Sequence, residues 1–277
     1  MSAVNPGAGV ANAKAGSIRV AGVDVRFAIP GGEVVALKSI DLSVNPGEFV
    51  CLLGPSGCGK STLLNAIAGF VPPTAGTIDA DGAKVKGPGP DRGMVFQEYA
   101  LFPWMTVAQN VAFGLQIQKK GKAEIAAKVG ALLSMLKLTD FAGRFPKDLS
   151  GGMRQRVAIA RVLAIDSPIL LMDEPFGALD ALTRRSLQDE LLRLWAEVKK
   201  TIVFVTHSIE ESIYLADRIV VMTYRPGTVK RELRVGLPRP RDPSTEPFNA
   251  LKREIARLVT EEQARHEQAE LKGLTTD

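Results

Sequence analysis

The sequence of 277 residues is poor in cysteine and histidine, with two of each. Cys51 and Cys58 do not suggest a disulfide framework or a metal cluster, and we expect a reducing, cytosolic compartment. No segment reaches the roughly 18 consecutive apolar residues that a membrane-spanning helix needs. Residues 1–16 lack the basic start and the apolar block of a secretory signal, so we expect them to form a flexible tail.

The composition is otherwise that of an ordinary globular protein, with 45% hydrophobic and 23% charged residues. The net charge is +5, and part of the excess lies late in the chain, at Lys230, Arg231, Arg234, Arg239 and Arg241. We interpret this cluster as a solvated face, with anionic lipid headgroups as the alternative partner. Because no aromatic residues interleave these charges to stack on bases, we expect no nucleic-acid partner.

Short apolar runs alternate with amphipathic helical patterns, which is typical of a parallel sheet with crossover helices. The runs at Ile169 and Ile202 are continuously apolar, as expected for parallel strands that are covered on both faces. The sequence therefore predicts an α/β core. The expected strands span residues 18–27, 34–44, 49–53, 169–172, 202–206 and 218–222.

Helical patterns without intervening strands run from about residue 98 to residue 163, which predicts an inserted helical subdomain. A proline-rich stretch that ends at Pro243 cannot continue a strand or a helix, so it marks the end of the core. We therefore expect a core domain over residues 17–242 and a helical tail over residues 243–277. The charged end of that tail, beyond Glu261, is expected to fray.

A glycine-rich stretch after the third expected strand matches the phosphate-loop pattern G-x-x-x-x-G-K-[ST]. Its glycines let backbone N–H groups wrap around phosphates, and the following helix N-terminus adds its dipole. Lys60 is expected to reach the β- and γ-phosphates, and the Ser61 hydroxyl to ligate Mg²⁺. The expected nucleotide-binding residues are Gly54, Pro55, Ser56, Gly57, Cys58, Gly59, Lys60, Ser61 and Thr62.

The phosphate loop alone does not distinguish between a kinase, a GTPase and an ATPase. Cys58 occupies a variable position of the motif, and we interpret it as a small filler. A bulky thiol reagent on Cys58 is expected to block nucleotide binding.

A second glycine-rich helix start occurs at Ser150, Gly151 and Gly152. The serine hydroxyl and the helix N-terminus form another anion-binding site. One nucleotide does not need two such sites within one subunit. The sequence therefore predicts a head-to-tail homodimer, in which each ATP is held by the phosphate loop of one subunit and the Ser-Gly-Gly helix of the other.

Two acids, Asp173 and Glu174, end an apolar strand at the position where ligands of open α/β sheets bind. Asp173 suits the Mg²⁺ shell, and Glu174 suits a general base that polarises the attacking water. The alternative is a strand-end acid that caps the next turn. His207 ends another strand, and we expect it to contact the γ-phosphate; a structural histidine is the alternative.

In order and spacing, these motifs resemble those of the ABC ATPase family over about residues 18–242. The resemblance implies a P-loop α/β fold with a mostly parallel core sheet, an antiparallel β part and an inserted helical subdomain. It implies that Gln97 senses Mg²⁺ and the γ-phosphate, and that Asp180 contacts the partner subunit. Phe27 is the candidate for stacking on adenine, with a plain strand-end aromatic as the alternative. Met153 stands where many relatives have Gln, and we expect function to survive this change.

Four stretches, residues 91–114, 172–184, 209–217 and 237–242, look like the ATPase subunits of importers for nitrate, taurine and alkanesulfonates. This resemblance implies a peripheral place on the cytoplasmic face of the inner membrane, separate transmembrane permease subunits, and an extracytoplasmic substrate-binding protein. The side chains expected to receive the permease are Tyr99, Leu101, Phe102 and Trp104. Their alternative role is in the core of the helical subdomain.

The main alternative function is that of a soluble ABC ATPase in DNA repair or translation. Such proteins typically carry a long coiled-coil insertion or two fused ATPase cassettes, and the sequence shows neither. A nucleotide-dependent regulatory module without turnover is disfavoured by Glu174 and His207. The sequence therefore predicts an ATPase, with ATP and Mg²⁺ as cofactors, that drives import of a small anionic solute.

Overall fold

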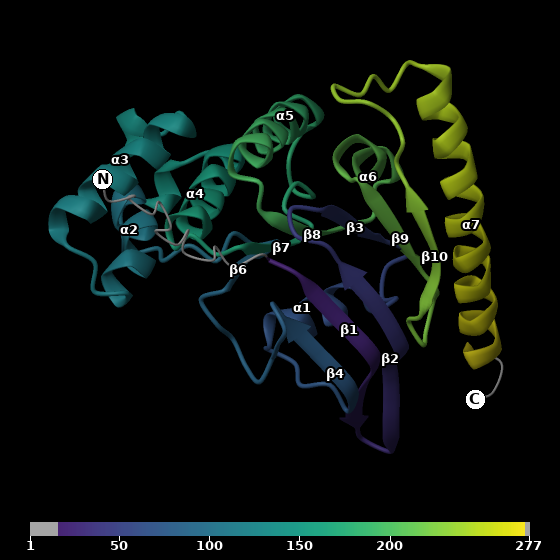
Figure 1. Cartoon of the computed structure of the whole chain (residues 1–277). Helices are drawn as coiled ribbons and strands as arrows, with labels where there is room; N and C mark the ends of the chain where they lie inside the picture. The colour runs from purple at the N-terminus through teal and green to yellow at the C-terminus, as the bar shows by residue number, and fades with distance from the viewer. Residues whose placement is uncertain (1–15, 275–277) are drawn as a thin grey trace, which may run out of the picture.

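The computed structural model describes residues 16–274, with side chains described to residue 265. The flexible tail expected over residues 1–16 lies outside the described residues except for Gly16. The described chain forms two β-sheets flanked by helices (Figure 1). The strands are β1 (Ile18–Ile29), β2 (Gly32–Val44), β3 (Phe49–Leu53), β4 (Ala75–Ala80), β5 (Ala83–Lys84), β6 (Arg92–Val95), β7 (Ile169–Asp173), β8 (Thr201–Thr206), β9 (Arg218–Met222) and β10 (Val229–Arg234). The α-helices are α1 (Lys60–Ala68), α2 (Val107–Ile117), α3 (Lys122–Met135), α4 (Gly151–Ala164), α5 (Ala181–Val198), α6 (Ile209–Leu215) and α7 (Glu246–Leu274).

The six-stranded sheet has the order β10-β9-β3-β8-β7-β6 and is parallel except for its edge strand β10. In the register of β3 and β8, Leu53 lies opposite Thr206, and in that of β6 and β7, Val95 lies opposite Met172. The parallel strands therefore end at one edge, where the loops that follow them meet. This confirms the prediction of a mostly parallel core sheet.

The four-stranded antiparallel sheet, of order β2-β1-β4-β5, packs against α1, with which it overlaps in the view of Figure 1. Its buried side chains share one hydrophobic core with α1 and with one face of β3, β7 and β8. The opposite face of the parallel strands packs against a second core that includes α4, α5 and α6. Because both faces are covered, β3 and β8 are buried along their full length, as their continuous apolar runs predict.

Between β6 and β7 the described chain forms helices and no strands, which confirms the inserted helical subdomain of the expected fold. Thr106 caps α2 by accepting from the Gln109 N–H, and the Gln109 side chain accepts from the Thr106 N–H, a reciprocal capping box. The side chain of Asn110 is fully buried and bonds the backbone of Phe102, Met105 and Thr106. These bonds fix the irregular segment that enters α2.

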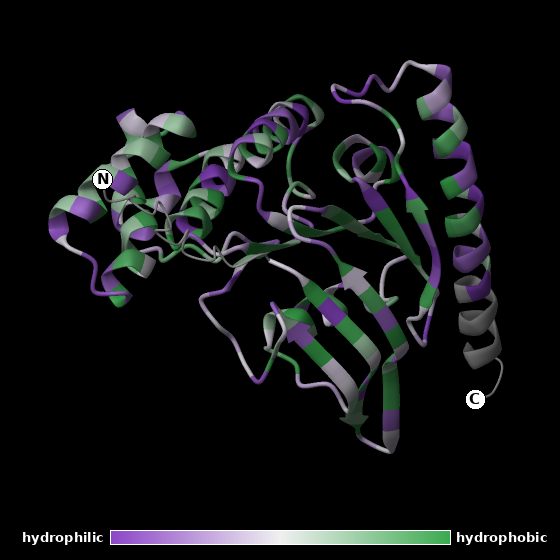
Figure 2. Cartoon of the chain, viewed as in Figure 1, coloured by the Kyte–Doolittle hydropathy of each residue, from purple (hydrophilic) through white to green (hydrophobic). Residues whose placement is uncertain are grey.

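Helix α7 follows β10 and packs along the outer edge of the parallel sheet (Figure 1). Hydrophobic and hydrophilic residues alternate along it, and Phe248, Ile255 and Val259 are buried (Figure 2). The helix continues to Leu274, and Glu262 is only 1% exposed. At Glu262 the expectation that the chain frays beyond Glu261 is therefore wrong, because this carboxylate is buried and paired with Lys230.

The late basic cluster is also not a uniform solvated face. Lys230 is mostly covered and paired with two glutamates, and the Arg239 side chain is only 26% exposed. Arg241 is buried and donates to the carbonyls of Ile213 and Ala216 at the end of α6. Burial lowers the pKa of Arg241 to about 10. Arg241 is buried because the carbonyls at the C-terminus of a helix lack partners within the helix and bind cations.

No helix in the described part of the chain has both the length and the apolar character needed to cross a membrane.

Candidate nucleotide-binding and hydrolysis site

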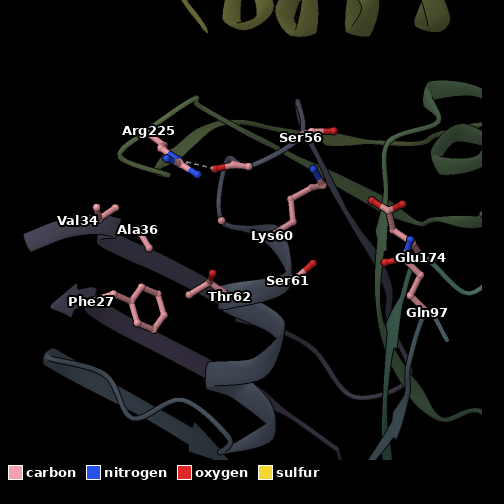
Figure 3. Close-up of a pocket in the computed structure, with 12 residues that line it drawn as sticks. Phe27, Val34, Ala36, Ser56, Lys60, Ser61, Thr62, Gln97, Glu174 and Arg225 are labelled. Atoms are coloured by element: carbon pink, nitrogen blue, oxygen red, sulfur yellow. Dashed lines mark hydrogen bonds between the residues drawn. The ribbon is translucent and has the colours of Figure 1, made fainter. Parts of the chain in front are cut away.

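A pocket of about 460 Å³ opens at the edge where the parallel strands end (Figure 3). Its volume is in the range of sites for cofactors and small molecules. Residues from β1, β2, the phosphate loop and the loops after β6, β7 and β9 line it. They are Phe27, Val34, Ala36, Ser56, Gly57, Gly59, Lys60, Ser61, Thr62, Gln97, Glu174 and Arg225.

The phosphate loop connects β3 to α1 and has the backbone shape that its glycines permit. Gly57 and Gly59 have φ values of +74° and +95°. A Cβ at Gly59 would lie 2.7 Å from a Leu37 methyl carbon and 3.0 Å from the Ala36 carbonyl oxygen. The loop is therefore folded tightly on β2, and the unpaired N–H groups at the start of α1 can bind an anion.

The Lys60 ammonium group lies inside this loop. It donates to the carbonyl oxygens of Gly54 and Pro55, each at 2.8 Å, and the lysine is only 5% exposed. Fixed in this way, the cation is positioned for the phosphate groups that the loop is shaped to receive.

Cys58 belongs to the loop through its backbone, but its side chain is fully buried. Burial raises the pKa of the Cys58 thiol. A protonated, covered thiol reacts poorly. A bulky thiol reagent is therefore expected to react slowly with Cys58 in the folded chain, and its block of nucleotide binding once attached stays a prediction. The interpretation of Cys58 as a small filler agrees with its buried position.

Asp173, the last residue of β7, and Glu174, which follows it, contact different partners. The Ser61 hydroxyl donates to Asp173 Oδ1 at 2.9 Å, so two of the three side chains expected to hold Mg²⁺ lie together. Burial raises the pKa of Asp173, the Ser61 hydrogen bond opposes this, and the charge of Glu174 adds to it. Gln97, in the loop after β6, lines the same pocket.

Glu174 also lines the pocket, with a backbone φ of +42°. This left-handed conformation is uncommon for a residue with a side chain and is found most often at functional sites. Glu174 Oε2 lies 2.9 Å from His207 Nδ1, and His207 follows β8. The side chains are 21% and 61% exposed respectively. The histidine is therefore placed to hold the carboxylate in position.

The serine–glycine motif is not brought to this pocket. Ser150 caps α4 by accepting from the Met153 N–H, and none of Ser150, Gly151 or Gly152 lines the pocket. A Cβ at Gly152 would lie 2.7 Å from a Thr183 methyl carbon, so close packing against α5 also requires this glycine. The second anion-binding helix start therefore remains available on the surface of the same chain.

Asp180 and Phe27, two further residues expected at the site, lie in different places, and only Phe27 lines the pocket. Asp180 caps α5 by accepting from the Thr183 N–H, and this bond lowers the pKa of Asp180. Phe27 lies near the end of β1, is 42% exposed and lines the pocket. It forms one wall of the pocket, at the end away from Glu174 (Figure 3).

Sequence reasoning missed Arg225, which lines the pocket from the turn after β9. It also missed Val34 and Ala36, which line it from β2. A phosphate-loop motif is readable because its residues are adjacent in the chain. These three residues approach the loop only through the sheet, and nothing in the local sequence signals their proximity.

A phosphate loop, a strand-end acid pair and a helical insertion between β6 and β7 together define a P-loop nucleoside-triphosphate hydrolase with an inserted helical subdomain. Residues 37–177 match the family described as ABC transporter. The chain belongs to this family. Its members hydrolyse ATP to drive transport, so the chain is an ATP-binding ATPase.

Three known proteins illustrate the relationship. The nitrate import ATP-binding protein NrtD of Synechocystis sp. is 52% identical over 75% of this chain and 78% of its own length. The taurine import ATP-binding protein TauB of Jannaschia sp. is 48% identical over 79% of this chain and 82% of its own length. A dimeric ATP-binding cassette solved in a post-hydrolysis state with ADP and Pi superposes with a TM-score of 0.71 at 35% identity, covering 79% of this chain and 98% of that one.

Proposed function

We propose that the chain is the ATP-hydrolysing subunit of an importer for a small anionic solute of the nitrate, taurine or alkanesulfonate type. The observation that carries this proposal is the convergence of Lys60, Ser61, Gln97 and Glu174 on one pocket. The chain is also about half identical to import ATPases for nitrate and taurine. The proposed location is the cytoplasmic face of the inner membrane.

The oxygen groups around Ser61 fit Mg²⁺. A hydroxyl, a carboxylate and an amide oxygen are ligands that this cation prefers, and the Ser61–Asp173 hydrogen bond already holds two of them together. We assign the ion to Ser61, Asp173 and Gln97. When bound, it neutralises charge on the β- and γ-phosphates.

Glu174 is the proposed general base. It lines the same pocket as Lys60 and Ser61. From there it can orient a water molecule towards the γ-phosphate and accept the proton of that water at a carboxylate oxygen. In its imidazolium form both ring nitrogens of His207 donate, so it can hold that carboxylate through Nδ1 and donate to a γ-phosphate oxygen through Nε2. The phosphate-loop N–H groups and Lys60 stabilise the charge on the phosphates.

The proposed assembly is a homodimer with two composite sites. Ser150, Gly151 and Gly152 start a helix outside the pocket of their own chain, so they are available to a nucleotide bound by a second copy. Asp180, at the exposed start of α5, is the proposed contact with the partner's site. The solved cassette dimer supports this arrangement by similarity.

The proposed permease contact lies at a groove of about 440 Å³ between α1 and the helical subdomain. Phe70 and Phe113 line it, and Phe70 is 50% exposed. The Phe113 ring lies 4.6 Å from that of Phe102, which continues the aromatic surface to Trp104, a residue that is 70% exposed. Arg161 donates to the carbonyls of Tyr99 and Ala100, which holds the aromatic segment after Gln97 against α4. Large exposed aromatic residues are typical anchors of protein interfaces.

Two of the four expected docking residues, Tyr99 and Leu101, are partly buried against the core and fit the alternative role better. Phe102 stacks near Trp104, with ring centroids 5.7 Å apart. We therefore assign the permease contact to Phe102 and Trp104. An extracytoplasmic substrate-binding protein completes the proposed system, and no nucleic acid takes part.

The function is tested by purifying the tagged chain from native membranes and reconstituting what copurifies in proteoliposomes. We expect permease subunits to copurify, and nitrate, taurine or an alkanesulfonate to increase ATP hydrolysis when a binding protein is added. Copurification with ribosomes or DNA in place of membrane subunits would overturn the importer assignment. The Lys60→Ala variant is the control for hydrolysis by contaminating enzymes.

A further inference from the structure

The turn between β9 and β10, residues 223–228, lies against the phosphate loop. The Gly227 N–H donates to the Ala36 carbonyl at 2.9 Å, and the Lys38 N–H donates to the Gly227 carbonyl at 3.0 Å. A Cβ at Gly227 would lie 2.2 Å from the Cys58 carbonyl oxygen. The turn is thus bonded to β2 and in close contact with the loop that binds phosphate.

Arg225, at the centre of this turn, extends over the pocket (Figure 3). Its Nε–H donates to the Gly57 carbonyl at 3.2 Å. No other protein partner of its guanidinium occurs in the described part of the chain, and the side chain is exposed. Several N–H donors of a permanent cation are therefore available beside the phosphate loop.

The position of Arg225 indicates which part of a nucleotide it meets. In Figure 3 it lies above Val34 and Ala36, on the Phe27 side of the phosphate loop. Glu174 and Gln97 lie on the opposite side. A nucleotide with its base at Phe27 and its γ-phosphate near Glu174 places the α- and β-phosphates within reach of Arg225.

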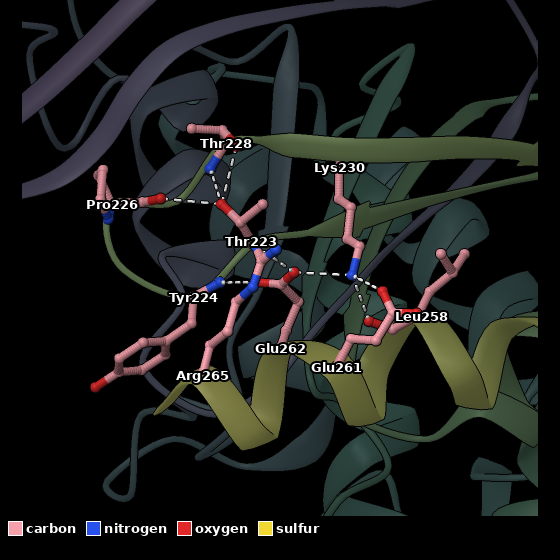
Figure 4. A network of polar contacts seen from close by, with 9 residues as sticks. All are labelled: Thr223, Tyr224, Pro226, Thr228, Lys230, Leu258, Glu261, Glu262 and Arg265. Atoms are coloured by element: carbon pink, nitrogen blue, oxygen red, sulfur yellow. Dashed lines mark hydrogen bonds and ion pairs between the residues drawn. The ribbon is translucent and has the colours of Figure 1, made fainter. Parts of the chain in front are cut away.

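The turn is fixed by bonds of its own. The Thr223 hydroxyl donates to the Pro226 carbonyl at 3.0 Å, lies 2.9 Å from the Thr228 hydroxyl, and accepts from the Thr228 N–H (Figure 4). The Thr223 N–H donates to the Thr228 carbonyl at 3.0 Å. These bonds close the turn and limit the positions open to Arg225.

Helix α7 anchors the same turn through a buried carboxylate (Figure 4). Glu262 accepts from the Tyr224 N–H at 3.0 Å, and Lys230 and Arg265 lie 2.8 and 3.2 Å from its other oxygen. Its side chain is 1% exposed. A buried charge with three donors is expensive to displace, so it holds the backbone next to Arg225 in place.

We infer that Arg225 is a nucleotide-binding residue that contacts the α- and β-phosphates, and that Glu262 of α7 is a positioning residue that acts through the turn. The inference rests on the proposed ATP site, to which it adds a residue outside the phosphate loop. The C-terminal helix thereby contributes to nucleotide affinity, although it lies outside the hydrolysis machinery.

The first experiment measures the Kd for ATP and ADP by titration calorimetry in Arg225→Ala and Arg225→Lys. We expect Arg225→Ala to weaken both nucleotides about three- to tenfold by equal factors, as for loss of a charge-assisted contact at a partly exposed site. The lysine variant should recover part of the loss. Hydrolysis should show a raised KM with kcat nearly unchanged. The matched control is Arg231→Ala, which removes an exposed cation on β10.

The second experiment concerns Glu262. Glu262→Ala should weaken both nucleotides in the wild-type background but have no further effect in Arg225→Ala, since the two residues act in series. Glu261→Ala is the matched control, because Glu261 pairs with the same Lys230 but does not hold the Tyr224 N–H. If thermal denaturation shows that Glu262→Ala is unfolded, Glu262→Met, which fills the same space but removes the carboxylate acceptor of the Tyr224 N–H, replaces it in the cycle.

The outcomes separate this inference from the proposed function. Unchanged affinity in Arg225→Ala, together with lost binding in Lys60→Ala, would overturn the inference and leave the ATP site intact. A larger loss for ATP than for ADP would place Arg225 at the γ-phosphate and contradict the assignment. Additive effects of Glu262→Ala and Arg225→Ala would remove Glu262 from the positioning role. Absence of nucleotide binding in the wild-type chain would instead overturn the proposed function.

Discussion

At the scale of single residues, the proposed general base is a carboxylate held by one hydrogen bond. Glu174 has a left-handed backbone and a 2.9 Å contact with His207, which together fix the direction of its side chain. The same residue lines the pocket next to Lys60 and Ser61. This geometry fits the role of the proposed general base, which must lie within hydrogen-bond reach of the attacking water.

Replacing Glu174 by Gln should reduce ATP hydrolysis about 10²–10⁴-fold, the usual contribution of a positioned base. ATP binding should be retained, because the phosphate loop and Lys60 are untouched. Phosphate release and calorimetric titration measure the two effects. Hydrolysis at the wild-type rate would remove Glu174 from the role of base.

Asp173 is expected to lower the stability of the folded chain while it supports Mg²⁺ binding. Burial raises its pKa, so the folded state disfavours the ionised form that Mg²⁺ requires. When folding raises the pKa of a carboxyl group, the free energy of unfolding of the protein falls as the pH rises from the unfolded-state pKa through the folded-state pKa. At neutral pH, Asp173→Asn should therefore raise the melting temperature of the nucleotide-free chain while weakening Mg²⁺-dependent ATP binding. A lower melting temperature in this variant would contradict the account.

Site residues that belong to one continuous motif could be predicted from the sequence, and those brought together only by the fold could not. Lys60 and Ser61 were predictable because the phosphate loop is one continuous motif. Arg225 was not, because its approach depends on the pairing of β9 with β3. Cys58 was correctly placed in the loop, but its burial follows from contact with Gly54 and Lys60 rather than from local pattern.

At the scale of elements, the strands with apolar runs were predictable and those with few apolar residues were not. All six expected strands form, with ends within two residues of those expected. Strands β4, β5 and β6 were missed because they contain few β-branched residues. Strand β10 was missed because most of its residues are charged, and its basic residues were interpreted as a solvated face. In the structure Lys230 and Arg231 pair with glutamates of α7.

Arg241 connects three elements, α6, β10 and the entry to α7. Its guanidinium bonds to the carbonyls of Ile213, Ala216 and Val235. Arg241→Ala should lower the free energy of unfolding by about 1–3 kcal/mol, since it leaves buried carbonyls without donors. Urea denaturation measures the change. The exposed Arg234→Ala serves as the control and should stay within about 0.5 kcal/mol of wild type, and equal effects would contradict this role.

The permease contact is an element-scale prediction as well. Trp104→Ala should reduce ATPase stimulation by the membrane subunits, by up to about 30-fold if the indole is a central anchor of the interface. ATP binding by the isolated chain should not change, since Trp104 does not line the nucleotide pocket. Ile117→Ala, at a residue that is 68% exposed on the same helical subdomain, is the matched control. Equal losses in both variants would argue against a defined contact at Trp104.

At the scale of the whole molecule, one chain carries two halves of a nucleotide site that do not meet. The pocket contains Lys60 and Glu174, and the Ser150 helix start lies outside it. The second glycine-rich helix start made the dimer predictable from sequence, and the structure adds that this helix start lies outside the pocket of its own chain. A second copy is the simplest source of the missing half, because symmetric dimers use the same surfaces reciprocally.

The most direct test of this composite site is sedimentation of Glu174→Gln, which retains ATP, with and without Gly151→Asp. An acid at Gly151 repels the phosphates of a partner's nucleotide but leaves the pocket of its own chain intact. We predict that Glu174→Gln is a monomer without nucleotide and a dimer with ATP. The double variant should bind ATP with unchanged affinity and remain a monomer. Dimers of equal stability in both variants would contradict the account.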